Sequence, residues 1–197
     1  EATVEELLHP ENQPDGIDMD VLERYFAEWQ WMIAGGPVLW TWRMINSKRP
    51  LEEKIALFWH GILCTGSSKI QHARQQQIEF DMFRNYGLGS FQDILLEISR
   101  DPGMIFYLDN CMSHKGAINE NWGRELLELF SLGVGMDGKL NYTEDDVKEA
   151  ARAFSGWQLR DGKFWFNPLQ HDAGNKTIFG KTGNFDGDDV VELCLAH

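Results

Sequence analysis

Apolar residues recur every three to four positions along most of the chain, which is the spacing of amphipathic helices. The first such run follows Asp18 or Asp20, either of which is a suitable N-cap. It contains Val21, Leu22, Tyr25, Phe26, Trp29, Met32 and Ile33. After the break Gly35-Gly36-Pro37, further helices are expected over residues 38–46, 50–64, 69–86, 91–98, 102–108, 118–133 and 144–155, and from Val190 onward. The pattern predicts a mainly α, bundle-like helical domain.

Two of these helices have a well-defined apolar face. In the helix that begins at Pro50, the residues expected to be buried are Leu51, Ile55, Phe58, Trp59, Ile62 and Leu63. In the helix over residues 118–133, the spacing i, i+4, i+7, i+8 predicts a packed stripe of Trp122, Leu126, Leu129 and Phe130.

Local signals mark the ends of other elements. Thr143 followed by Asp146 is a weaker form of the capping box, and Asp186 to Asp189 are typical of another helix start. Asp161-Gly162 lies between two short runs, residues 158–160 and 163–166, and predicts a two-residue hairpin. A small β excursion is therefore expected near residues 158–180.

The two ends of the chain suggest its domain organisation. Residues 1–17 are acidic and contain Pro10, Pro14 and Gly16, which is typical of an extended arm or linker. Residues 18–197 are then expected to form a single mostly helical domain. Because the chain starts without Met and stops inside a predicted helix, we expect this domain to be incomplete at both ends.

Composition and charge narrow the class of partner. Of the 197 residues, 43% are hydrophobic, which suffices for a sizeable core. The net charge of −13 argues against nucleic acid or an anionic membrane as partner, because phosphate binding needs clustered Lys and Arg. No apolar run is long enough to span a membrane. Cys64, Cys111 and Cys194 have no CxxC spacing, so free thiols are favoured over a disulfide, which stays possible.

The helix over residues 118–133 has the most concentrated polar chemistry. Asn121, Glu125 and Glu128 share one stripe, with Arg124 beside it. The functional interpretation is a carboxylate cluster that binds a hard cation or acts in acid–base chemistry, with Arg124 as a clamp for a carboxylate or another anion. The alternative is a solvated helix face whose acids complement the helix dipole, and spacing alone favours this alternative.

Two histidines are further candidates. His60 lies near the apolar ridge of its helix, where a lone histidine is usually a hydrogen-bonded core residue. His171-Asp172 lies in a polar loop with Lys176 nearby and suits either a polar pocket or a surface turn. No nucleotide-binding loop, serine-hydrolase elbow, HExxH or complete EF-hand pattern is present.

Several blocks of residues occur in the order and spacing of one large bacterial family. They are Pro50 to Lys54 with Phe58-Trp59-His60, Asp101 to Asp109, Asn119 to Gly135, Tyr142 to Trp157, and His171-Asp172 with Lys176 and Phe179-Gly180. Over roughly residues 37–197 the chain resembles the uncharacterised family called domain of unknown function eighteen hundred. One departure is that Trp59-His60 is followed by Gly61-Ile62-Leu63, whereas the family block usually has a second histidine.

The resemblance implies a longer parent protein and export from the cytoplasm, to the periplasm or cell surface. It also implies a frequent gene neighbour from another uncharacterised, sulfatase-like family. The family name carries no activity.

Two functions therefore stay open. In the first, His60, Arg124, Glu125, Glu128, His171 and Asp172 form a buried polar centre for metal-assisted or acid–base chemistry on an envelope or polysaccharide-type substrate. The catalytic residues would then be Arg124, Glu125 and Glu128, and the ligands of a divalent metal ion would be His60, Glu125, Glu128, His171 and Asp172. In the second, the chain is a non-catalytic scaffold or accessory subunit of an extracytoplasmic assembly, and its polar cluster is structural.

Overall fold

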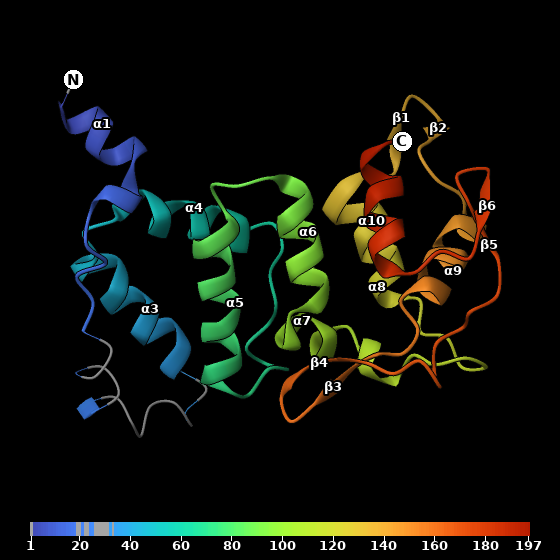
Figure 1. Ribbon diagram of the computed structural model, residues 1–197, viewed down its shortest axis with the longest axis horizontal. Helices are drawn as coiled ribbons and strands as arrows, with labels where there is room; N and C mark the ends of the chain where they lie inside the picture. Colours follow the sequence, from blue (N-terminus) through green and yellow to red (C-terminus); the bar gives the residue numbers. More distant parts are fainter. Residues whose placement is uncertain (1, 19–20, 22–23, 26–31, 33) are drawn as a thin grey trace. The chain divides into compact units, whose positions relative to one another are not determined.

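The computed structural model describes residues 2–18, 21, 24–25, 32 and 34–197, and it contains two compact units, Glu1–Ile94 and Leu95–His197 (Figure 1). The helix expected after Asp18 lies largely outside the described residues. At its start, however, Asp18 Oδ1 accepts a hydrogen bond from the backbone N–H of Val21 at 3.1 Å, as an N-cap does. The single domain expected over residues 18–197 stays a prediction.

Helices dominate both units. The first unit contains α1 (Ala2–Leu8), the 3-10 helix η1 (Pro10–Asn12), α3 (Gly35–Asn46), α4 (Pro50–His60) and α5 (Ala73–Tyr86), and α6 (Phe91–Arg100) runs from it into the second. The second unit continues with α7 (Pro102–Tyr107), η3 (Asn110–Met112), α8 (Asn121–Glu125), the π-helix η4 (Leu126–Ser131), α9 (Glu144–Ala153) and α10 (Gly187–Leu195). Within the described residues, no helix is both long enough and apolar enough to cross a membrane.

The strands form small antiparallel hairpins. They are β1 (Gly135–Met136) with β2 (Lys139–Leu140), β3 (Trp157–Arg160) with β4 (Lys163–Phe166), and β5 (Lys176–Ile178) with β6 (Lys181–Gly183). Asp161 and Gly162 both have positive φ, 53° and 72°, which is the left-handed backbone that a type I′ turn needs. The mainly α fold with a small β excursion near residues 158–180 is confirmed.

The segment expected as an extended arm or linker, residues 1–17, contains a helix in its first half. Residues Ala2–Leu8 form α1, and the helix ends before Pro10. The run from Ala2 to Leu8 contains no Gly or Pro, so nothing in it opposes a helix. The segment after η1 is also tied down, because Arg49 Nε donates to the carbonyl of Gln13 at 2.7 Å.

In the first unit, α4 and α5 lie side by side (Figure 1). The face that α4 buries differs from the expected one: Phe58 and Ile62 are exposed, whereas Glu53 and Ala56 are buried. The reason is that Glu53 finds its hydrogen-bond partners on α3 and α5, so the polar side chain faces inward and the helix is rotated accordingly.

In the second unit, α8 packs closely on α9. A Cβ on Gly123 would lie 2.9 Å from the backbone nitrogen of Ala151, so only glycine permits this approach. Thr143 caps α9 with the reciprocal Asp146 bonds expected of a capping box, and Asp186 caps α10. Both capping predictions are confirmed.

The segment expected to be one α-helix over residues 118–133 changes type in its middle. It is α-helical only to Glu125 and becomes a π-helix over Leu126–Ser131. The wider turn changes which leucine is buried: Leu127 is fully buried, and Leu129, expected in the packed stripe, is 64% exposed. The Ser131 hydroxyl donates to the Leu126 carbonyl at 2.5 Å, which satisfies a carbonyl within the widened turn.

Candidate functional site

His60, the last residue of α4, is paired with a fully buried carboxylate. Its Nδ1 lies 3.0 Å from Oε1 of Glu79, which is on α5 and has no exposed surface. The second oxygen of Glu79 accepts a hydrogen bond from the Thr65 hydroxyl at 2.5 Å. Both carboxylate oxygens are therefore engaged, and the acceptor for His60 is fixed in place.

Aromatic rings enclose the imidazole of His60. The rings of Trp40, Phe80 and Phe83 meet it edge-on, with centroids at 5.3, 5.1 and 6.3 Å. The His60 side chain nevertheless keeps 26% of its surface exposed. Because Nδ1 faces a carboxylate, we assign the hydrogen to Nδ1, which leaves the Nε2 lone pair available as a proton acceptor.

A second buried carboxylate, Glu53, lies two helical turns before His60 on α4. Its Oε1 accepts from Nε of Arg84 at 2.7 Å and from Nε of Arg43 at 3.1 Å. Its Oε2 accepts from Nη2 of Arg84 at 3.2 Å and from the Trp40 indole at 3.1 Å. Four hydrogen bonds saturate this carboxylate, and the bidentate Arg84 pair fixes its orientation.

The two arginines on Glu53 each bind a further acid. Arg43 donates from Nη2 to both oxygens of Asp15, at 3.2 and 3.1 Å, and Arg84 donates to Asp81. Acids and arginines therefore alternate along this cluster. A buried Glu/Arg arrangement therefore surrounds Glu53 in the first unit.

Arg124 itself is partly exposed and is bound by acids of its own unit. Its guanidinium donates to both oxygens of Glu144, at 2.9 and 2.8 Å, and to Oε2 of Glu120 at 3.2 Å. Glu120 and Arg124 are an i, i+4 pair on the same side of the helix. The clamp predicted for Arg124 stays a prediction, and its guanidinium is bound by Glu144 and Glu120.

Glu125 and Glu128 are half-buried at the junction of α8 and the π-helix. The hydroxyl of Tyr142 donates to Oε2 of Glu128 at 3.3 Å. Burial, and then the nearby charge of Glu128, raise the pKa of the Glu125 carboxyl above its usual value. Glu125 and Glu128 both stay predicted acid–base groups.

Asp172 and His171 are fixed by α9 and the residues that follow it. Arg152 donates to Asp172 Oδ2 at 3.0 Å, and this hydrogen bond is the main cause that lowers the pKa of Asp172 to about 2. His171 Nδ1 lies 2.9 Å from the carbonyl of Ser155. Lys176, fully buried, donates to the carbonyls of Asp172 and Gly174 at 2.6 and 3.1 Å. The His171-Asp172 loop is therefore pinned to its own unit.

The predicted metal ligands do not gather into a cluster in the part of the chain that the structure describes. Among those residues, no three His, Cys, Asp or Glu side chains are grouped so that they would hold a metal ion. His60 Nδ1 is engaged by Glu79, and the Asp172 carboxylate is engaged by Arg152. The divalent ion stays a prediction, which metal analysis of the purified protein would test.

Sequence reasoning missed Glu53, Glu79 and Arg84. One signal was available for the first, because Glu53 and His60 are seven residues apart and so share one face of a helix. The sequence indicates the burial of Glu79 only weakly. Glu79 is next to Phe80 and three residues from Gln76, in a helix with many polar residues. Their partners are 19 and 31 residues away in sequence, beyond the reach of local patterns.

Among known proteins, one family matches the chain. The family described as protein of unknown function (DUF1800) matches residues 3–197, which extends the expected resemblance to nearly the whole chain. No curated protein and no solved structure matches the chain.

Proposed function

The chain belongs to this family of unknown function, and from that premise we propose that it performs acid–base chemistry with His60 as the group that accepts and returns a proton. The observation that carries the proposal is the 3.0 Å contact between His60 Nδ1 and the fully buried Glu79. An imidazole oriented by a fixed carboxylate, with its other nitrogen available, is the recurrent arrangement of a general base.

The roles of the two residues follow from their atoms. The Nε2 of His60 accepts a proton from a hydroxyl or a water, and the imidazolium that forms is stabilised by the Glu79 carboxylate. Thr65 keeps that carboxylate in place through its 2.5 Å hydrogen bond. A positioned base of this type contributes a factor of roughly 10² to 10⁴ in rate.

The proposed substrate is a hydroxyl-rich molecule of the cell envelope, such as a polysaccharide, encountered outside the cytoplasm. Its hydroxyl groups supply protons that a histidine base can accept. The support for the location is the family resemblance. In the second unit, Glu125 and Glu128, with Arg124 beside them, are a separate proposed acid–base group whose contribution is tested independently.

The test uses the full chain and a panel of envelope polysaccharides and their esters, with products detected by mass spectrometry. Wild type is compared with His60→Gln and Glu79→Gln, and with Glu125→Gln as the test of the second group. Gln at position 60 retains a polar side chain but removes the titrating ring. We expect product formation to fall by about 10² to 10⁴ in His60→Gln, and by less in Glu79→Gln, where the base remains without its anchor.

Two results would overturn this assignment. One is unchanged turnover in His60→Gln, which would remove the histidine from the chemistry. The other is no product from the wild type on any substrate of the panel together with co-purification of a stoichiometric partner, which would favour the second function below.

The second candidate is a non-catalytic subunit of an extracytoplasmic assembly. The observation that favours it is that four large apolar side chains between residues 129 and 140 are exposed: Leu129 on the π-helix, Val134 just before β1, Met136 in β1 and Leu140 in β2. Exposed large apolar side chains, where they form a contiguous patch, are typical of protein contact surfaces. Native mass spectrometry of the protein isolated from its source cells, with Met136→Glu beside it, tests this candidate. A partner lost in Met136→Glu supports the subunit role, and a monomer in both samples contradicts it.

A further inference from the structure

Trp40 contacts both the buried Glu53 and His60, the histidine paired with the buried Glu79. Its indole N–H donates to Oε2 of Glu53 at 3.1 Å. Its ring meets His60 edge-on at 5.3 Å and stacks on Phe80 at 3.9 Å with an interplanar angle of 24°. One rigid side chain therefore connects the Glu53 ion pairs with the imidazole of His60.

These contacts fix the orientation of the Trp40 ring. An indole has one donor and two rotatable side-chain bonds, so a single hydrogen bond together with one stacked neighbour defines its plane. The acceptor is itself immobile, because Glu53 is buried and bound by Arg84 and Arg43. Arg84 binds both oxygens of this carboxylate, and such a bidentate pair fixes the orientation of the acceptor.

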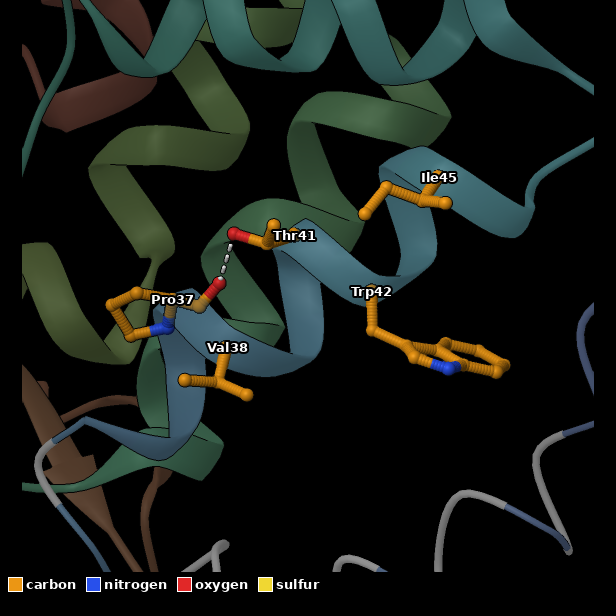
Figure 2. A pocket seen from close by; sticks show the side chains of 5 residues that line it. All are labelled: Pro37, Val38, Thr41, Trp42 and Ile45. Atoms are coloured by element: carbon orange, nitrogen blue, oxygen red, sulfur yellow. Dashed lines mark hydrogen bonds between the residues drawn. The ribbon is translucent and has the colours of Figure 1, made fainter.

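A pocket also lies on α3, the helix that carries Trp40, but it does not involve His60. The pocket has a volume of about 370 Å³ and is lined by Pro37, Val38, Thr41, Trp42 and Ile45. Figure 2 shows the Trp42 indole extending away from α3. These side chains carry no ionisable group. The α3 residue that contacts both Glu53 and His60 is Trp40, which is buried.

We propose that Trp40, oriented by Glu53, is a positioning residue that holds the His60 ring with Nδ1 on Glu79 and Nε2 available. Trp40 supplies one wall against the imidazole and orients Phe80, which supplies another at 5.1 Å. What the positioned imidazole does rests on the proposed function. The positioning itself is measurable without any substrate.

The experiment is NMR of the full chain labelled with ¹⁵N-histidine. In wild type, we expect the ring nitrogens of His60 to report the Nδ1–H tautomer and its Nδ1–H signal to be protected from exchange with water. Trp40→Phe removes the indole donor but retains an aromatic ring, and Glu53→Gln removes the charge that orients the indole. We expect the protected Nδ1–H signal to be lost in both variants, while circular dichroism shows that the helices remain.

Trp59→Phe is the matched control. Trp59 also donates from its indole, to the carbonyl of Gly87 at 2.9 Å, and stacks on Phe91. A general loosening of the unit would therefore appear in this variant too. We expect the His60 signal to be unchanged in Trp59→Phe.

The outcomes separate the positioning role from the proposed chemistry. A His60 signal that is unchanged in Trp40→Phe, or lost equally in Trp59→Phe, overturns the positioning role. Trp40→Phe decides the matter even where Glu53→Gln fails to fold, because it leaves the Glu53 ion pairs with both arginines in place. If the signal responds as expected but His60→Gln turns over substrate normally, the positioning role stands and the proposed function fails.

Discussion

The Nε of Arg152 donates to Oδ2 of Asp172 at 3.0 Å, and this bond ties the loop before β5 to α9. The same guanidinium donates to both oxygens of Glu149 at 2.7 Å. Arg152 therefore joins two acids that are far apart in sequence. The loop that carries His171 depends on it for its position.

Asp172→Asn is expected to destabilise the second unit at neutral pH. The Arg152 hydrogen bond lowers the pKa of Asp172 from 3.8 to about 2. A carboxyl whose pKa is lowered on folding stabilises the fold above its unfolded pKa, and this contribution disappears as the pH falls from 3.8 toward 2. We expect a loss of at most about 2 kcal/mol in the free energy of unfolding at pH 7.

Urea unfolding of both proteins at pH 7, 4 and 2.5 measures this effect. The difference between wild type and Asp172→Asn should shrink at the lowest pH. The control is Asp145→Asn, which removes an acid that is 89% exposed and whose Oδ1 lies 3.3 Å from Nζ of Lys148. Equal destabilisation by both variants would contradict the special role of the Arg152 pair.

Lys176→Met is expected to change how stability depends on pH at the alkaline end. Burial lowers the pKa of Lys176 below 10.5, so the folded chain releases this proton at a lower pH than the unfolded chain does. Between the lowered folded pKa and 10.5 the unfolded state binds more protons, and this residue therefore makes stability rise with pH.

The measurement is the free energy of unfolding from pH 8 to 10.5. We expect the wild-type curve, after subtraction of the Lys176→Met curve, to slope upward in that range. Lys181→Met, at an exposed position of the same hairpin, should give a difference curve without that slope. A flat difference for Lys176 would show that its ammonium group is not destabilised by burial.

Leucine substitutions test the π-helix directly. Leu127→Ala should cost about 2–5 kcal/mol, because Leu127 is fully buried. Leu129→Ala should change stability by no more than about 0.5 kcal/mol, because this side chain lies on the surface. An ordinary α-helix with the stripe expected from spacing would give Leu129→Ala the larger cost, so thermal or urea unfolding of the two variants distinguishes the two registers.

Thiol labelling tests the packing around Cys194. Burial raises the pKa of the Cys194 thiol to about 11, and the thiolate is the reactive form. With iodoacetamide at pH 8, we expect rapid modification of the exposed Cys64 and very slow modification of Cys194. Peptide mass spectrometry gives both rates, and unfolding in urea should make them similar. Rapid labelling of Cys194 in the folded protein would contradict its burial.

Features that depend on neighbouring residues could be predicted from the sequence. The Thr143–Asp146 capping box, the Asp186 cap and the Asp161-Gly162 turn each act over four residues or fewer. The β1–β2 hairpin was missed although Asp137-Gly138 is the same signal, with φ of 53° and 76°. Its strands have only two residues each, too few for an alternating pattern.

Features that depend on distant partners could not be predicted. The spacing of apolar residues predicts that α4 buries Phe58, but the structure buries Glu53 instead. The reason is that two arginines from other helices compensate the charge of Glu53, and an indole donates a further hydrogen bond to it. His60 was identified as a candidate, but its partner Glu79 was not. A sequence pattern records how polar a helix face is, and it does not record which charges meet there.

The π-helix Leu126–Ser131 has an implication for comparing relatives of this chain. A turn closed between residues i and i+5 contains one residue more than a turn closed between i and i+4. Such a turn is what the insertion of one residue into a regular α-helix would produce. An alignment with a relative that keeps a regular α-helix should therefore open a one-residue gap inside Leu126–Ser131. If that gap lies between Glu125 and Glu128, these two residues align with positions of the relative that are only two residues apart.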